Sequence, residues 1–146
     1  AVEVVRTHLA SLGVASDGLV IGNGSGLYDT NRVSTAQLTG LLRSVYQDPR
    51  YAADFLASLP IAGADGTLRR RMKTGATLRR VRAKTGTLNG VSALSGYAFL
   101  DDGRVLAFSI LMNGFPKWQV GLARRAQNNL VEAMFRALSP TTPAPN

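Results

Sequence analysis

The sequence of 146 residues contains no cysteine and only one histidine, and these absences remove several kinds of chemistry. Without cysteine the chain can form no disulfide, thiolate zinc site or thiol nucleophile, although the cellular compartment stays open. His8 has no acidic or serine partner placed to form a triad, so we expect it on a helix surface. No HExxH motif, calcium loop or cluster of carboxylates occurs, so we expect neither a metal nor a cofactor.

Long apolar runs are also absent. Stretches such as Val105 to Met112 are far too short to cross a bilayer, so we expect no transmembrane segment in this chain. No basic segment followed by a hydrophobic one opens the sequence, which predicts no signal peptide here. The chain is nevertheless 45% hydrophobic, which is enough for a folded domain and excludes a disordered polyelectrolyte.

Positive charge is abundant and is concentrated in one stretch. The chain has 17 Lys and Arg residues against 9 Asp and Glu, a net charge of +8. Residues 69–84 carry eight cations and no acid, so nine basic residues (17 − 8) balance the nine acids elsewhere. Such a patch is typical of proteins that bind nucleic acid, acidic polymers, anionic lipid surfaces or anionic small substrates. The cations are Arg69, Arg70, Arg71, Lys73, Arg79, Arg80, Arg82 and Lys84.

Residues 1–60 predict mainly helices. Val2, Val5, Leu9 and Leu12 recur at helical spacing, and a glycine-rich loop follows a short apolar run. Ser34, with Gln37 three residues later, fits a capping box that begins a second helix. The expected elements are a helix over 2–12, a strand over 18–21, a loop over 22–27, a helix from Ser34 to about Gln47, and a helix from Asp48-Pro49 that stops by Pro60.

Residues 79–138 predict a meander of three strands and a long helix, which gives the α+β class. Asn89-Gly90 and Asp101-Asp102-Gly103 are strong hairpin signals, and the last strand is apolar on both faces. We therefore expect a sheet covered on both sides, with the long helix on one face. The expected elements are a loop over 61–78, strands over 79–88, 91–100 and 104–113, a helix over 119–138 with Val120, Ala123, Leu130, Met134 and Leu138 inward, and a disordered tail over 139–146.

The tripeptide Lys-Thr-Gly occurs twice, and its context separates the two copies. Lys84-Thr85-Gly86 lies inside a predicted strand that leads into the Asn89-Gly90 turn. Lys73-Thr74-Gly75 lies in the predicted loop, and we interpret it as a coincidence. Lys-Thr-Gly on a strand is the third motif of the penicillin-recognising serine enzymes.

The residue types of this motif suit the binding of a peptide end. The strand can pair with an extended peptide, and the Lys84 ammonium can attract a terminal carboxylate and help to move protons. The Thr85 hydroxyl can hydrogen-bond that carboxylate, and Gly86 leaves room for substrate against the backbone. The N–H group of Thr87 can face a developing oxyanion.

Three ordered segments resemble one known family, the class C low-molecular-mass penicillin-binding proteins, which are D-Ala-D-Ala carboxypeptidases and endopeptidases. Together they cover roughly residues 18–115, and Asn23 and Tyr28 stand where the family has Asp and Ser. We assign no catalytic role to Asn23 or Ser25. The segments are Asn23-Gly24-Ser25-Gly26-Leu27 with Asn31-Arg32-Val33-Ser34, then Leu59 to Leu68, and Ala83 to Val91.

The resemblance implies a fold and a function. The fold is the C-terminal part of a penicillin-binding, β-lactamase-like transpeptidase domain, which residues 1–138 would supply. The function is that of an exported peptidoglycan carboxypeptidase, or endopeptidase, in the periplasm or cell envelope. Its partners would be a peptide stem ending in D-Ala-D-Ala, β-lactams and the missing N-terminal part of the protein. Lys84 would be catalytic, and Thr85, Gly86 and Thr87 would bind substrate.

The family's other two motifs are absent from this sequence. No Ser is followed by Lys at the third position, and no Ser precedes Asn by two. We therefore expect the chain alone to form no acyl-enzyme. Two alternatives stay open, a catalytically dead scaffold of this fold and a basic module for nucleic acid or an anionic envelope polymer. No aromatic residue occurs between 69 and 84, so we expect no nucleic-acid partner.

Overall fold

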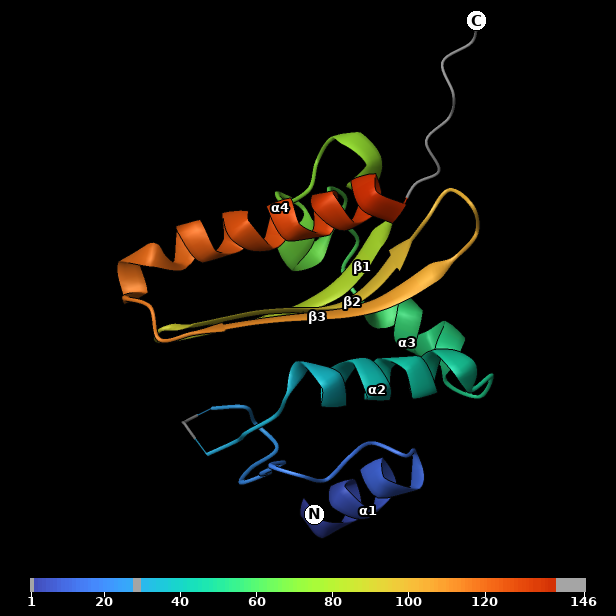
Figure 1. The fold of residues 1–146 in the computed structure, drawn as a ribbon, viewed down its shortest axis with the longest axis vertical. Helices are drawn as coiled ribbons and strands as arrows, with labels where there is room; N and C mark the ends of the chain where they lie inside the picture. The colour runs from blue at the N-terminus through green and yellow to red at the C-terminus, as the bar shows by residue number, and fades with distance from the viewer. Residues whose placement is uncertain (1, 28–29, 139–146) are drawn as a thin grey trace, which may run out of the picture.

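A three-stranded antiparallel sheet lies between two layers of helix in this computed structural model, which describes residues 2–27 and 30–138 (Figure 1). Helix α4 (Val120–Leu138) covers one face of the sheet. Helix α2 (Thr35–Gln47) covers the other face, and α1 (Val2–Ser11) lies beyond α2. The predicted α+β class is confirmed, whereas the expectations for Tyr28 and for the tail over 139–146 fall outside the described residues.

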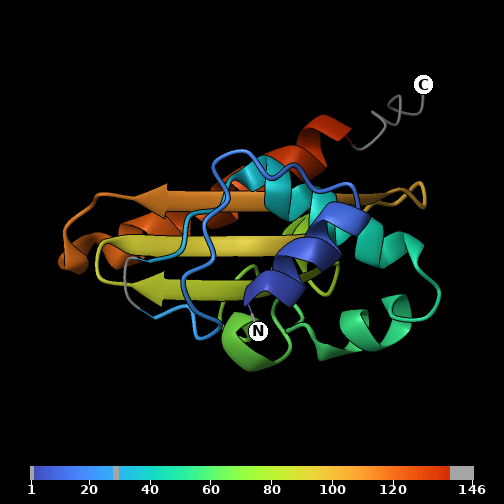
Figure 2. The same cartoon turned by 90° about the horizontal axis from the view of Figure 1, so that it is seen from below.

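The sheet is the predicted meander, with β1 (Val81–Leu88), β2 (Val91–Phe99) and β3 (Val105–Asn113) in that order (Figure 2). The start predicted for the first strand, at residue 79, is wrong by two residues. Arg79 adopts a left-handed backbone conformation with φ of 59°, which no strand accommodates. The other predicted strand ends agree to within one residue, the ordinary uncertainty of such boundaries.

Both faces of the sheet are buried, as the apolar pattern of the last strand predicts. On the α4 face, Leu106, Phe108 and Ile110 of β3 join a core that includes Val131 and Phe135 of α4. The opposite face contributes Tyr97, Val105 and Ala107 to a second core, which Leu42 of α2, Leu59, and Phe55 and Leu56 of α3 (Ala52–Ser58) complete. Alternation along β3 therefore supplies two cores at once.

The buried stripe of α4 differs from the predicted one. Leu130 is 49% exposed, so its predicted inward orientation is wrong. The buried residues recur every fourth position, and one of them is the polar Gln127, whose amide nitrogen donates to Ser92 Oγ at 3.1 Å. A satisfied amide is tolerated in a core, but an apolar pattern does not reveal it. The stripe consists of Ala123, Gln127, Val131 and Phe135.

The N-terminal half confirms the two long helices but not the predicted strand over 18–21. Only Val20 forms a β-bridge there, with Arg32. The capping box at Ser34 is present, and the Gln37 side chain also donates to the carbonyl oxygens of Ala15 and Asp17 at 2.9 Å. These bonds hold the preceding loop against α2. Helix α1 has the predicted span but buries no residue among those described.

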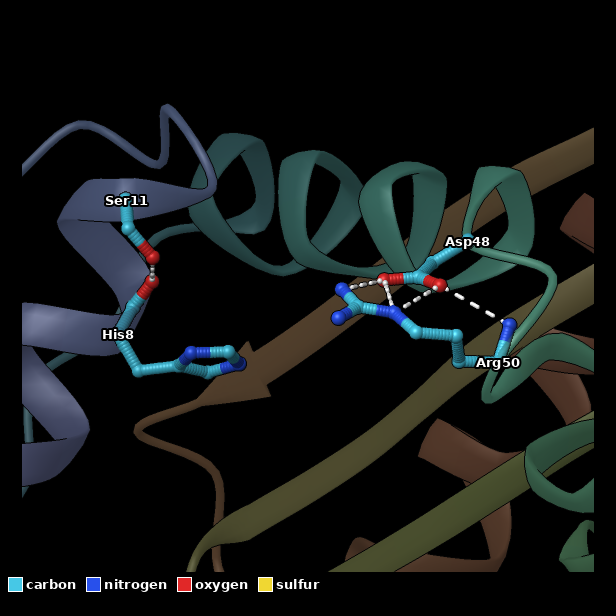
Figure 3. Close-up of polar contacts among 4 residues, drawn as sticks. All are labelled: His8, Ser11, Asp48 and Arg50. Atoms are coloured by element: carbon cyan, nitrogen blue, oxygen red, sulfur yellow. Dashed lines mark hydrogen bonds and ion pairs between the residues drawn. The ribbon is translucent and has the colours of Figure 1, made fainter.

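The helix predicted from Asp48-Pro49 begins only at Ala52. Asp48 instead accepts hydrogen bonds from the Arg50 backbone N–H at 3.0 Å and from its guanidinium, as Figure 3 shows. Such an aspartate turn competes with the first turn of a helix. The hydrogen bonds from Arg50 lower the pKa of Asp48 to about 2. Because the Arg50 side chain is 73% exposed, the ion pair adds little stability.

Tyr97 joins the sheet to α2 through a buried hydroxyl. Its side chain is 1% exposed, and its hydroxyl donates to the Leu42 carbonyl oxygen at 2.7 Å. The ring packs 5.5 Å from the Tyr46 ring and edge-on to Phe55. Burial, with a smaller contribution from Tyr46, raises the pKa of Tyr97 to about 12.

We predict that Tyr97→Phe lowers the free energy of unfolding by about 1 to 2 kcal/mol, because the Leu42 carbonyl loses a buried partner. Urea denaturation of a protein containing this chain measures the change, and Tyr51→Phe, 52% exposed, is the matched control. The folded state favours neutral Tyr97, so its stabilisation is complete below about pH 10 and is lost between about pH 10 and 12. Equal effects of the two substitutions at neutral pH would contradict this account.

Candidate functional site

The outer edge of β1 is paired along only half of its length. The segment at Pro60–Ala62 lies beside the start of the strand, where Ala83 N donates to the Pro60 oxygen at 3.0 Å and Ala62 N donates to the Val81 oxygen at 2.9 Å. Backbone groups alternate along a strand, so the odd-numbered residues of β1 face this edge. Among the described residues, the pairing stops at Ala83.

The unpaired part of this edge begins at the second Lys-Thr-Gly. Thr85 and Thr87 are odd-numbered, so their backbone N–H and C=O groups face outward, and no described backbone group pairs with them there. An open strand edge is a template for another extended chain. The prediction that this Lys-Thr-Gly lies on a strand is confirmed.

The side chains of this segment divide between the two faces of the sheet. Lys84 lies opposite Ser95 and shares the α2 face with Arg82 and Tyr97, which are themselves paired. Its ammonium curls to the open edge, where Nζ donates to the Thr85 carbonyl oxygen at 2.8 Å. The ammonium therefore lies beside the unpaired backbone.

The two threonines point toward the α4 face. Thr85 Oγ1 donates to Thr67 Oγ1 at 3.0 Å, which ties the strand to the loop before it. Thr87 Oγ1 accepts a hydrogen bond from the Arg124 guanidinium of α4 at 3.2 Å. Gly86 lies between them, and a Cβ there would approach the Ala93 Cβ to 3.3 Å. The structure thus brings together all four residues that the sequence singles out.

Two further residues position this strand, and the sequence interpretation missed both. A Cβ on Gly96 would lie 2.1 Å from the Arg82 oxygen, so only glycine lets β2 approach β1 just before Lys84. A glycine inside a predicted strand was the available signal. The second residue is Arg71, which binds α4 from the loop over 61–78.

Arg71 is a half-buried cation that holds the loop to α4. Its guanidinium donates to Asn128 Oδ1 at 2.8 and 2.9 Å, to Gln127 Oε1 at 3.0 Å and to the Arg124 carbonyl oxygen at 3.3 Å. Burial and, to a smaller extent, the charge of Arg124 lower the pKa of Arg71. Arg71 therefore fixes the part of α4 that faces Thr87.

The predicted basic patch is not one continuous surface, because several of its cations have structural partners. Arg80 pairs with Asp101, and Arg82 donates to the Leu56 carbonyl oxygen at 3.2 Å. Arg80 thus binds the turn after β2, Arg82 binds α3, and Arg71 binds α4. Arg69, Arg70, Lys73 and Arg79 are exposed.

A family model described as the D-Ala-D-Ala carboxypeptidase 3 (S13) family matches residues 1–135. The chain belongs to this family. It is 45% identical over 115 residues to a D-alanyl-D-alanine carboxypeptidase of an Actinomadura species, covering 75% of this chain and 21% of that protein. It is 36% identical over 118 residues to the carboxypeptidase DacB of Mycolicibacterium smegmatis, covering 77% of this chain and 26% of that protein.

A solved structure shares the fold. Penicillin-binding protein 4 from Haemophilus influenzae, complexed with a β-lactam, superposes with a TM-score of 0.79 at 26% identity, over 90% of this chain and 32% of that one. The resemblance seen in the sequence is therefore confirmed, and the chain corresponds to a C-terminal portion of the family's fold. It spans about a fifth to a third of the length of these relatives.

The structure gives a local role to Asn23, where the sequence departs from the aspartate that the family resemblance implies. Asn23 Oδ1 accepts from the N–H groups of Ser25 and Gly26 at 3.1 and 3.0 Å. Its Nδ2 donates to the Leu27 oxygen at 2.9 Å and to Thr30 Oγ1 at 2.6 Å. An ionised aspartate has no donor, so an aspartate at this position could not make the two bonds that Asn23 Nδ2 donates. These contacts favour the interpretation of the loop as a turn that leads to α2.

The other candidate groups lie apart from this strand. Lys73-Thr74-Gly75 lies in a turn at the start of the 3₁₀ helix Gly75–Thr77, not on a strand. His8 is exposed on α1, where its backbone oxygen accepts from Ser11 (Figure 3). In the described ranges no three His, Asp or Glu side chains gather as metal ligands, and none of the described helices is long and apolar enough to span a membrane.

We predict that Arg71→Ala in the S13 chain costs about 2 to 3 kcal/mol of stability, because it removes a charged donor from three acceptors on α4. Arg71→Lys should recover only part, since an ammonium cannot bridge these acceptors as a guanidinium does. Thermal or urea unfolding measures both changes. Arg70→Ala, which removes the same charge from an exposed neighbour, is the control, and an equal effect of the two alanine substitutions would sink the prediction.

Proposed function

We propose that the complete protein is a serine-type D-Ala-D-Ala carboxypeptidase and that this chain supplies the substrate-binding wall of its cleft. The observation that carries the proposal is the open edge of β1 at Lys84-Thr85-Gly86-Thr87, in a chain of the S13 family. The unpaired backbone can bind an extended peptide, and a cation lies beside it. Binding a peptide end needs these two elements.

In this proposal the substrate's last residues pair with the outward backbone groups of Thr85 and Thr87. The Lys84 ammonium makes the edge positive near the reacting bond and helps to transfer protons. The N–H group of Thr87 faces outward and can donate to the oxygen that becomes negative as the carbonyl carbon turns tetrahedral. Gly86 keeps this surface free of a side chain on the α2 face.

The nucleophile comes from outside this chain, because no Ser-x-x-Lys motif occurs in it. The serine oxygen bonds to the D-Ala carbonyl carbon, the bond to the last D-Ala breaks, and that residue leaves as the amine with an added proton. Water then hydrolyses the ester and regenerates the serine. A β-lactam would acylate the same serine, and the β-lactam complex of the Haemophilus influenzae relative supports this step. The chain alone is accordingly inactive.

The proposed substrate also implies a cellular location and partners for the complete protein. D-Ala-D-Ala occurs at the end of peptidoglycan stems, so the complete protein would be exported and would act in the periplasm or cell envelope. Residues 1–138 would form one catalytic domain with the remainder of that protein.

The two alternatives lack a supporting feature. A basic binding module would need its cations on one surface, but Arg71, Arg80 and Arg82 bind other elements of the fold. A dead scaffold was suggested by the changes at Asn23 and Tyr28. The Asn23 amide organises its own loop, and Tyr28 lies outside the described residues.

We predict that Lys84→Ala lowers both the labelling rate with fluorescent penicillin and the release of D-Ala by about 100-fold or more in the complete protein. The second Lys-Thr-Gly gives a matched control, because Lys73→Ala removes the same charge from an exposed turn and should change neither rate more than about twofold. Undiminished labelling and turnover after Lys84→Ala would remove Lys84 from the mechanism.

A further inference from the structure

Arg124 lies beside the candidate site but belongs to neither Lys-Thr-Gly nor the basic stretch. It is the fifth residue of α4 and approaches β1 from the face opposite Lys84. Its guanidinium donates to Thr87 Oγ1 at 3.2 Å, and the side chain is exposed. Among the described residues no carboxylate lies within ion-pair distance of it. Its charge is therefore uncompensated at the open edge.

The hydrogen bond from Arg124 leaves the Thr87 hydroxyl with a free donor. A guanidinium can only donate, so Thr87 Oγ1 is the acceptor in this contact. The hydroxyl hydrogen then points elsewhere, and no described group accepts it. A guanidinium and a free hydroxyl donor side by side form a site for an anion that accepts both, and a carboxylate does so with its two oxygens.

Contacts between α4 and the preceding loop fix the position of Arg124. The Arg71 guanidinium donates to the Arg124 backbone oxygen at 3.3 Å. It also donates to the Asn128 side chain, one turn further along α4. Two guanidinium groups are thus held near each other. Burial and, to a smaller extent, the charge of Arg124 lower the pKa of Arg71. An anion bound at Arg124 would relieve this repulsion.

We propose that Arg124 determines specificity by binding the C-terminal carboxylate of the substrate peptide together with the Thr87 hydroxyl. The inference rests on the proposed carboxypeptidase function and assigns its carboxylate site to the α4 face. Lys84, on the other face, is then free to act on protons at the reacting bond. Through Arg124 of α4, which lies outside the catalytic motifs, the chain distinguishes a peptide with a free C-terminal carboxylate from one without it.

The test compares two N-acylated peptides that end in D-Ala-D-Ala, one with a free carboxylate and one with a C-terminal amide. In the complete protein, Arg124→Ala should lower kcat/KM for the carboxylate peptide by about 10- to 100-fold and leave that for the amide within about twofold. Arg124→Lys should give an intermediate loss of kcat/KM for the carboxylate peptide. Lysine keeps the positive charge but cannot form the two parallel hydrogen bonds of a guanidinium. Arg125→Ala is the matched control, since it removes the same charge from an exposed residue next along α4.

Thr87→Val supplies a second measurement. If Arg124 and Thr87 bind the same carboxylate, the loss in the double variant should be smaller than the product of the two single losses. An unchanged preference for the carboxylate peptide after Arg124→Ala, or equal losses for both peptides, overturns the inference. If the protein cleaves neither peptide, the proposed function fails by itself. Calorimetric binding of the same two peptides to the same variants then decides whether Arg124 recognises the carboxylate.

Discussion

Backbone pairing along the outer edge of β1 extends from Val81 to Ala83 and no further, and the candidate site depends on this limit. Before it, Pro60–Ala62 satisfies the outward groups of the strand. After it, Thr85 and Thr87 present the same kind of groups, and no described backbone group pairs with them. Unpaired strand edges are a hazard for a folded protein unless something covers or uses them. Here the open half carries a cation, two hydroxyl groups and a glycine, which suits the binding of a peptide.

Rigid support for this edge comes from both sides of the sheet. Tyr97 fixes β2 to α2 through the Leu42 carbonyl, and Gly96 allows the close approach of β1 to β2. Arg71 holds the preceding loop and α4 together, and Arg124 of α4 reaches Thr87. Most of the described polar contacts around the strand therefore fix its position, and the exposed groups at its edge remain for a ligand. Three of the eight cations in the basic stretch, Arg71, Arg80 and Arg82, bind other elements of the fold rather than forming a separate surface.

Local chemistry explains which features the sequence could predict. The capping box at Ser34 and the turn at Asn89-Gly90 need only neighbouring residues, and both are present in the structure. The Lys-Thr-Gly on β1 could be chosen over Lys73-Thr74-Gly75 because only one copy has a strand around it. By contrast, Gln127 is buried because Ser92 and Arg71, far away in the sequence, satisfy its amide. No pattern within α4 contains that information.

The same limit applies to the site itself. Lys84, Thr85, Gly86 and Thr87 are adjacent in the sequence, so a motif could find them, whereas Arg124 reaches Thr87 only through the packing of α4 on the sheet. Because β1 displays successive side chains on opposite faces, two cations can flank one bound peptide without competing for the same space. The Lys-Thr-Gly motif identifies only the cation on β1, which is Lys84. The recognition of a substrate's free end and the chemistry at its reacting bond can therefore be separated across the thickness of a single strand.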